Sequence, residues 1–349
     1  MKLTKPLLTL VKISKIVCIV SITCVSYYRS NDNNYYLTKN RHERRINLKQ
    51  RHWGLIGLIT YLVVILFLMV TNWQPFQRTT QKPIRVITSL NFYGETAKAV
   101  AGKYGQVTSL INSAAVDPHE YQPTTAQARQ LSRANVVIEN GLGYDQWLSK
   151  MVKADSGNQK VISVGNQIAG KKAGANEHVW YQPQTMMNLT SAFAKQYGQL
   201  DPHHREYYQA QAKKYQAKLT NLNQVIAKAK EGVSGNQKVA VSEPVFDYAL
   251  QNLGYQIIDR HFEKAIEDGN DPSPTDIAQL RQAIINHQIA FFVNNSQASD
   301  TTVKNLVKLA HQNQVPVLNV TESKPDHLTY VEWITSEYQR LIKVQAEVH

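Results

Sequence analysis

Residues 201–230 read DPHHREYYQAQAKKYQAKLTNLNQVIAKAK and contain no glycine and, after Pro202, no proline. An aspartate followed by a proline favours a helix start, because the acid suits the N-cap and proline fits the first turn. About 26 residues from Arg205 to Lys230 would span roughly 39 Å as a helix, enough to cross from one lobe to another. Gly232 and Gly235 then end the pattern. The stretch therefore predicts one long helix that divides the chain.

Short runs rich in β-branched residues alternate with helix-like segments on both sides of this stretch. They are Ile84–Thr88, Val107–Ile111, Val136–Glu139 and Val161–Val164, then residues near 238–242, 255–258, 289–293 and 316–320. Such alternation predicts parallel sheets covered by helices. We expect an α/β protein of two lobes, each a mostly parallel sheet with flanking helices, joined by the long helix. The expected domains are a leader (1–83), a first lobe (84–200), the linking helix (201–234) and a second lobe (235–349).

The positive charge of the chain is concentrated in the leader. Residues 1–85 hold 14 of the 39 basic residues and two of the 26 acidic ones, which leaves 25 basic and 24 acidic residues for 86–349. The lobes are thus nearly neutral and carry no basic footprint for nucleic acid. Cys18 and Cys24 are the only cysteines, so neither a disulfide nor a thiolate metal site is available to the lobes.

The leader contains an uncharged segment, about residues 53–73, that begins and ends with tryptophan. Its 21 residues would span about 30 Å as a helix, the thickness of a hydrocarbon core. Basic residues precede it and no comparable charge follows closely, so the positive-inside rule exports the lobes. We expect an uncleaved transmembrane anchor, with a processed signal peptide or an overextended start as alternatives. Cys24 lies in a poor lipoprotein cleavage context.

Four side chains lie on loops that leave strand-like runs. His119 belongs to DPHEYQP (117–123), His178 belongs to NEHVWYQP (176–183), and Glu243 and Glu322 directly follow two later runs. Open α/β sheets bind ligands beyond the carboxyl ends of their strands. Two imidazoles and two carboxylates suit a divalent first-row metal. We expect His119 and His178 on one wall of a cleft, and Glu243 and Glu322 on the other.

The same stretches carry a resemblance that extends from about residue 84 to about 345. They are DPHEYQPT (117–124), ANVVIENGLGYD (134–145), HVW (178–180), VSEPVFDY (241–248) and VTES (320–323). The chain resembles the metal-binding solute-receptor subunits of bacterial zinc and manganese ABC importers, the cluster A-I binding proteins. The resemblance implies a monomeric, non-enzymatic receptor at the extracytoplasmic face of the cell membrane. Such a receptor captures Mn²⁺ or Zn²⁺ and delivers it to permease subunits that are driven by a separate ATPase.

Three positions depart from the family pattern. Gln122 stands where many relatives have glutamate, Glu177 replaces the proline that usually precedes the second histidine, and Glu322 matches a position that is commonly aspartate. Two carboxylates beside two imidazoles form a harder ligand set than three imidazoles would, which favours Mn²⁺ as cargo. The Irving–Williams order favours Zn²⁺ in intrinsic affinity, so both ions stay candidates.

Two other classes of protein use similar features. A membrane-anchored metallohydrolase would need a motif such as His-Glu-x-x-His, which is absent, and neither a Gly-x-Ser-x-Gly elbow nor a P-loop occurs. A surface adhesin of the same fold is the second alternative. His203 and His204 also follow an Asp-Pro pair, but they lie at the predicted helix start and are interpreted as surface residues. Glu120 and Glu177 are either outer-sphere acceptors for the histidines or solvated loop acids.

Overall fold

The fold is described from a computed structural model that covers residues 57, 60–65, 67–68, 83–155, 157–298 and 300–348. Most of the predicted membrane anchor, residues 53–73, lies outside this description. Residues 57, 60–65 and 67–68 are helical. Within the described part of the chain, no helix combines the length and apolar composition that a membrane crossing requires. The following account concerns the compact unit formed by residues 81–349.

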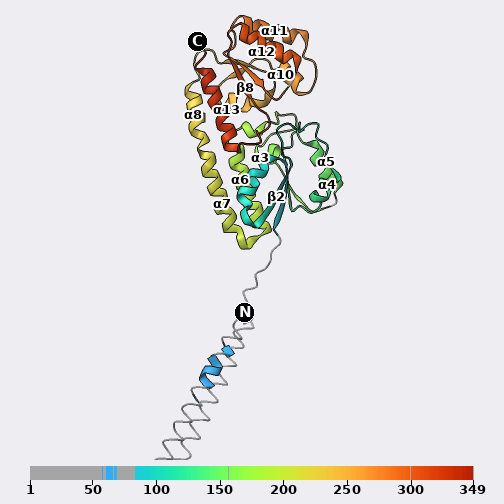
Figure 1. Ribbon diagram of the computed structural model, residues 1–349, viewed down its shortest axis with the longest axis vertical. Helices are drawn as coiled ribbons and strands as arrows, with labels where there is room; N and C mark the ends of the chain where they lie inside the picture. The colour runs from blue at the N-terminus through green and yellow to red at the C-terminus, as the bar shows by residue number, and fades with distance from the viewer. Residues whose placement is uncertain are drawn as a thin grey trace, which may run out of the picture. The chain divides into compact units, whose positions relative to one another are not determined.

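The first lobe is a four-stranded parallel sheet in the order β2-β1-β3-β4 with helices packed against it (Figure 1). Its strands are β1 (Ile84–Leu90), β2 (Gly105–Ile111), β3 (Val136–Glu139) and β4 (Lys160–Ser163). Its helices are α3 (Asn91–Ala101), α4 (Thr125–Leu131), α5 (Gln146–Ala154) and α6 (Thr185–Leu200), with short turns η2 (Gly102–Tyr104), η3 (Val164–Ile168), η4 (Val179–Tyr181) and η5 (Pro202–His204). β1 and β3 are buried along most of their length, and Val86–Ile87 and Val136–Ile138 are apolar without alternation, as expected for strands covered on both faces.

The second lobe repeats this topology, with the parallel order β6-β5-β7-β8. Its strands are β5 (Lys238–Val241), β6 (Gln256–Ile257), β7 (Phe292–Asn295) and β8 (Val317–Val320). Its helices are α9 (Asp247–Leu253), α10 (Arg260–Glu267), α11 (Pro274–Ile285), α12 (Thr301–Gln312) and α13 (Tyr330–Gln345), with the short turn η6 (Pro244–Phe246). The prediction of two α/β lobes with parallel sheets is confirmed. The third strand of this lobe begins three residues later than expected, since its ladder to β8 starts at Phe292.

The predicted long helix is present as two consecutive helices, α7 (Arg205–Thr220) and α8 (Leu222–Glu231). Asn221 lies between the two helices, but its backbone stays in the right-handed helical region. Figure 1 shows α7 beside the first lobe and α8 beside the second, where α8 packs against α13. The pair therefore connects the lobes along one side.

A buried aromatic cluster joins the lobes below the cleft. Trp180 follows the second histidine, and Trp333 belongs to α13; both are fully buried. Phe92 of the first lobe lies 5.3 Å from Trp180 and 5.6 Å from Trp333, measured between ring centroids. Tyr330 of α13 donates a hydrogen bond to the carbonyl of Trp180. Burial of large rings at this junction fixes the position of the loop that carries His178.

Candidate metal centre

A cavity of about 1030 Å³ lies between loops at the carboxyl ends of the two sheets. Its lining includes nine acidic residues and two basic ones, Arg260 and Lys264. The acidic residues are Asp117, Glu120, Glu177, Glu243, Asp247, Glu263, Glu267, Asp268 and Glu322. This surplus of negative charge attracts cations into the cleft. Every residue predicted from sequence as a metal ligand lies at this cleft or against its wall.

His119 lies on the loop that follows β2, and a third of its side chain is exposed. Asp117 accepts a hydrogen bond from the backbone N–H of His119, which folds the loop into an Asx turn. The indole of Trp147 donates to the carbonyl of Pro118 and ties the same loop to α5. Tyr144 packs edge-on against the imidazole, with ring centroids 4.6 Å apart. These contacts present His119 to the cleft.

His178 is completely buried, and Asn176 sets its orientation. Asn176 Oδ1 lies 2.8 Å from both the backbone nitrogen and Nδ1 of His178. If Nδ1 carries the proton and donates it to Asn176, Nε2 keeps its lone pair for a metal, which is a usual arrangement for metal-binding histidines. Nε2 is buried and has no hydrogen-bond partner. The second lobe holds Asn176 in turn, since its amide donates to the carbonyl of Pro244 and its own carbonyl accepts from Tyr248.

Glu322 faces both histidines from the loop after β8. Its Oε1 lies 3.9 Å from His119 Nε2 and 3.7 Å from His178 Nε2. Tyr144 donates a hydrogen bond of 2.7 Å to the same oxygen, so a residue of the first lobe positions a carboxylate of the second. The structure thus brings together three of the four predicted ligands, two imidazoles and one carboxylate.

Glu243 lies on the same side of the cleft as Glu322, but its carboxylate is bound by an amide instead of facing the histidines. Its Oε2 accepts a 2.5 Å hydrogen bond from Asn295 Nδ2, and that amide also lies 3.5 Å from Glu322 Oε2. Within the described residues, Glu243 forms no ion pair with either histidine. Asn295 therefore separates the two predicted carboxylates in this structure.

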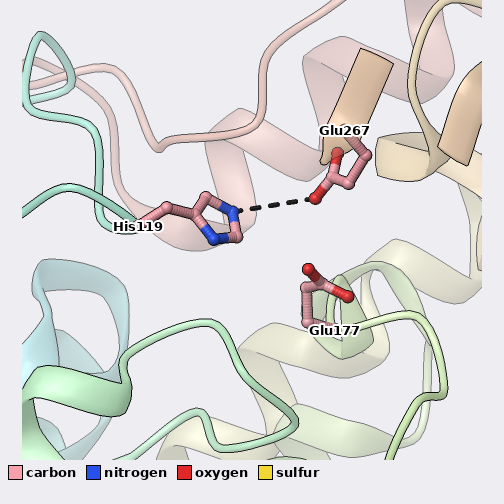
Figure 2. Close-up of side chains that lie close together, drawn as sticks. All are labelled: His119, Glu177 and Glu267. Carbon is pink, nitrogen blue, oxygen red and sulfur yellow. Dashed lines mark ion pairs between the residues drawn. The ribbon is translucent and has the colours of Figure 1, made fainter. Parts of the chain in front are cut away.

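A carboxylate that sequence reasoning missed occupies the position facing the histidines. Glu267, the last residue of α10, places Oε1 3.7 Å from His119 Nε2 and 3.8 Å from His178 Nε2. Figure 2 shows its carboxylate directed at His119, with Glu177 close by. Potential ligand atoms of His119, Glu177 and Glu267 all lie within 4.8 Å of one another. The spacing of Glu263 and Glu267, four residues apart beside buried Phe262, is the one sequence signal for an acid on the inner face of α10.

The proximity of these groups changes their proton affinities. Burial disfavours the charged form of His178, but the carboxylates of Glu267 and Glu322 outweigh it and raise the pKa of His178 to about 9. Burial raises the pKa of Glu267 above its ordinary value, although His178 opposes that effect. Burial also raises the pKa of Glu243. The pKa of Glu322 is lowered despite its burial, because His178 and Tyr144 stabilise its ionised form.

The spacing of the facing atoms suits a shared cation. Two ligands about 2.1 Å from an ion and arranged tetrahedrally lie about 3.4 Å apart. The four nitrogen-to-oxygen separations in the site are 3.7–3.9 Å, a few tenths of an ångström longer than that. The arrangement can therefore hold a divalent transition metal through imidazole and carboxylate groups.

The second Asp-Pro-His motif lies away from the cleft. His204 Nδ1 donates a hydrogen bond to the Asp201 carboxylate, and its ring stacks on Tyr104 with ring centroids 3.6 Å apart. His203 lies in η5 at the start of the linking helices. Both histidines belong to the helix start, where the sequence placed them.

Comparisons with known proteins identify the family to which the chain belongs. A family model described as "Zinc-uptake complex component A periplasmic" matches residues 86–344. The manganese-binding lipoprotein MntA of Halalkalibacterium halodurans is 25% identical over 180 residues, which cover 50% of this chain and 59% of that protein. The metal ABC transporter substrate-binding lipoprotein SloC of Streptococcus mutans is 25% identical over 251 residues, 66% of this chain and 79% of that protein.

Solved structures share the fold. The Mn-bound periplasmic metal-binding protein of Candidatus Liberibacter asiaticus superposes with a TM-score of 0.62 at 19% identity, covering 75% of this chain and 99% of that one. FpvC of P. aeruginosa in complex with Ni²⁺ gives a TM-score of 0.65 at 19% identity, covering 77% of this chain and 98% of that one.

The two parallel-sheet lobes and the histidine–carboxylate cleft define the class of two-lobed metal-binding proteins. The chain belongs to the family of the periplasmic A component of zinc-uptake complexes, whose model matches most of its length. Of the two relatives, SloC is named as a substrate-binding lipoprotein of a metal ABC transporter and MntA as a manganese-binding lipoprotein, and neither name describes an enzyme. The family resemblance seen in the sequence is thus confirmed.

Proposed function

We propose that this protein is an extracytoplasmic receptor that captures a divalent transition metal, Mn²⁺ or Zn²⁺, and delivers it to the permease of an ABC importer. The observation that carries the proposal is the convergence of two histidines on Glu322, whose Oε1 lies 3.9 Å from His119 Nε2 and 3.7 Å from His178 Nε2. Family membership and the names of the relatives support it. A separate ATPase supplies the energy for transport.

The four ligands proposed from the sequence are His119, His178, Glu243 and Glu322. Glu243 is the one that must move, because Asn295 now holds its carboxylate. Rotation of that amide away from the carboxylates would free Glu243 for the ion. A receptor of this kind needs such an adjustable contact, since it must release its cargo at the permease.

Purified full-length protein should bind about one Mn²⁺ or Zn²⁺ per chain after chelation and dialysis against each ion. Elemental analysis of the dialysed protein measures this directly. A chain that retains neither ion would contradict the proposal, whereas retention of an ion without transport would leave the adhesin alternative.

The choice between the two ions is best made by nutrition. Manganese is the proposed cargo because two carboxylates beside two imidazoles form a harder, more oxygen-rich ligand set than three imidazoles would. Deletion of the gene should slow growth under manganese limitation, and added Mn²⁺ should restore it. Rescue by Zn²⁺ alone would assign zinc as the cargo.

The leader is proposed to tether the lobes outside the cell through residues 53–73. The uncharged segment and the basic flank before it support this topology. Protease added to intact cells should digest the lobes. Complete protection would contradict the topology, and release of a soluble form would indicate signal-peptide cleavage.

A further inference from the structure

We propose that Glu267 is a direct ligand of the captured ion and that it adds a carboxylate, from α10, to the set predicted from the strand-exit loops. This inference rests on the proposed metal-receptor function. It assigns to the ion a site of two imidazoles and up to three carboxylates, formed by His119, His178, Glu243, Glu267 and Glu322.

Glu267 stands in the same geometric relation to the histidines as Glu322. Its Oε1 lies 3.7 Å from His119 Nε2 and 3.8 Å from His178 Nε2, whereas Glu322 Oε1 lies 3.9 Å and 3.7 Å from the same two nitrogens. Both carboxylates therefore face the same pair of ligand atoms. A geometric criterion that accepts Glu322 as a ligand must accept Glu267 as well.

Glu267 Oε1 and His178 Nε2, which face each other, have no hydrogen-bond partner. The Glu267 side chain is 5% exposed, and its Oε1 accepts no hydrogen bond. His178 Nε2 is likewise buried without a partner. Among the described residues, Glu267 forms no ion pair with a lysine or arginine. A buried carboxylate without a hydrogen bond is costly, and a cation between it and the imidazoles would remove that cost.

The position of Glu267 in its helix is also unfavourable without a cation. It is the last residue of α10, and the C-cap residue that follows is Asp268. Negative charge at a helix C-terminus opposes the helix dipole. A divalent ion at this end would offset the negative charge of the Glu267 carboxylate.

Independent contacts hold α10 in place. Arg260, its first residue, pairs with the buried carboxylate of Asp247 at the start of α9 and with Glu263. Phe262 is buried in the apolar cluster formed with α11 and α12. The helix is thus anchored at its beginning, and its end is directed into the cleft.

An additional carboxylate changes which ion the site prefers. Zinc is usually complete with four protein ligands in tetrahedral geometry. Manganese accepts higher coordination numbers and prefers oxygen ligands. Glu267 should therefore contribute more to the affinity for Mn²⁺ than to the affinity for Zn²⁺.

The test compares Glu267→Gln with Asp268→Asn in the full-length protein. Each variant removes one negative charge from neighbouring positions of the same cleft, but Asp268 is exposed and pairs with Lys264. Kd values for Mn²⁺ and Zn²⁺ are measured for both variants and for the wild type. Melting of the metal-free proteins checks that each variant folds, and Glu267→Asp provides a second, shorter carboxylate.

We expect Glu267→Gln to raise the Kd for Mn²⁺ by about tenfold or more and the Kd for Zn²⁺ by less. Asp268→Asn removes only charge from the cleft and should raise both Kd values by the same, smaller factor. Glu267→Asp should restore part of the Mn²⁺ affinity. Equal Kd values for Glu267→Gln and Asp268→Asn, with a wild type that binds metal, would overturn the role of Glu267 and leave the receptor function intact. Equal loss for both ions would overturn its part in selectivity. A wild type that binds neither ion would overturn both proposals.

Discussion

The first lobe holds its two imidazoles in fixed orientations, whereas the second lobe supplies carboxylates whose contacts can change. Asn176 sets the ring of His178, and Trp147 and Asp117 hold the loop of His119. On the opposite wall, Asn295 contacts both Glu243 and Glu322, and Glu267 Oε1 has no hydrogen bond. If the proposed function holds, the imidazoles of the first lobe are in place before the ion binds, and capture and release depend mainly on the carboxylates of the second lobe.

The largest loss of metal affinity should come from replacing an imidazole of the first lobe. His178→Ala removes a fully buried imidazole that is a proposed ligand. We expect the affinity for the metal to fall by well above the roughly 100-fold that is seen when an outer-sphere partner is removed. Titration with Mn²⁺ and Zn²⁺ measures it. His203→Ala, outside the cleft, is the control and should bind as the wild type does. Loss of binding in His203→Ala would show that the second Asp-Pro-His motif had been misinterpreted.

Replacements of the carboxylates of the second lobe should differ from each other in the metal affinity that they cost. Glu322→Ala removes a carboxylate that already faces both histidines and should weaken binding severely. Glu243→Ala should also weaken binding, but less, because its carboxylate must first leave Asn295. Kd values for the two variants rank them. A greater loss in Glu243→Ala would show that the second lobe rearranges fully around the ion.

Asn176→Ala tests whether the His178 ring must be oriented before the ion binds. The variant keeps both imidazoles but removes the acceptor at His178 Nδ1 and the contact with Pro244. We expect affinity to fall by about 10–100-fold, as for other partners of metal-binding histidines. His203→Ala, which changes a residue at the start of the linking helices, is again the control. Unchanged affinity in Asn176→Ala would mean that packing against Trp180 and Tyr144 alone orients the ring.

Proton competition should give a smaller, graded effect. Because the pKa of His178 is raised to about 9, the empty protein holds a proton there at neutral pH, and metal binding must release it. Affinity should therefore rise by up to about tenfold per pH unit as the pH increases from about 6 to 8, and it should level off near 9. Calorimetry in buffers of different ionisation enthalpy counts the released protons. A pH-independent Kd would indicate that His178 is neutral before binding.

The same contrast explains what could be predicted from the sequence. His119 and His178 lie in local motifs, and Glu322 directly follows a strand, so their positions could be inferred from the carboxyl ends of parallel strands. Glu267 has no such motif. It reaches the site because Arg260 and Phe262 dock α10 against its neighbours, and the only local signal is its spacing of four residues from Glu263.

The fold shows a similar division. Repeated β-branched runs predicted both parallel sheets, since burial on both faces makes such strands continuously apolar. The first residue of β7 could not be predicted from the sequence. Ile289–Phe291 are as buried as the strand, but they precede its pairing with β8. The long helix was predicted without its interruption at Asn221, which has no glycine or proline to mark it.

Thermal melting of the chelated full-length protein, with and without Mn²⁺ or Zn²⁺, tests the central claim most directly. An ion that binds only the folded state at a thousandfold excess over its Kd raises the free energy of unfolding by about 4 kcal/mol. The account predicts a clear increase in Tm with at least one of the two ions, and its loss in His178→Ala. An unchanged Tm with both ions would contradict the metal-receptor account.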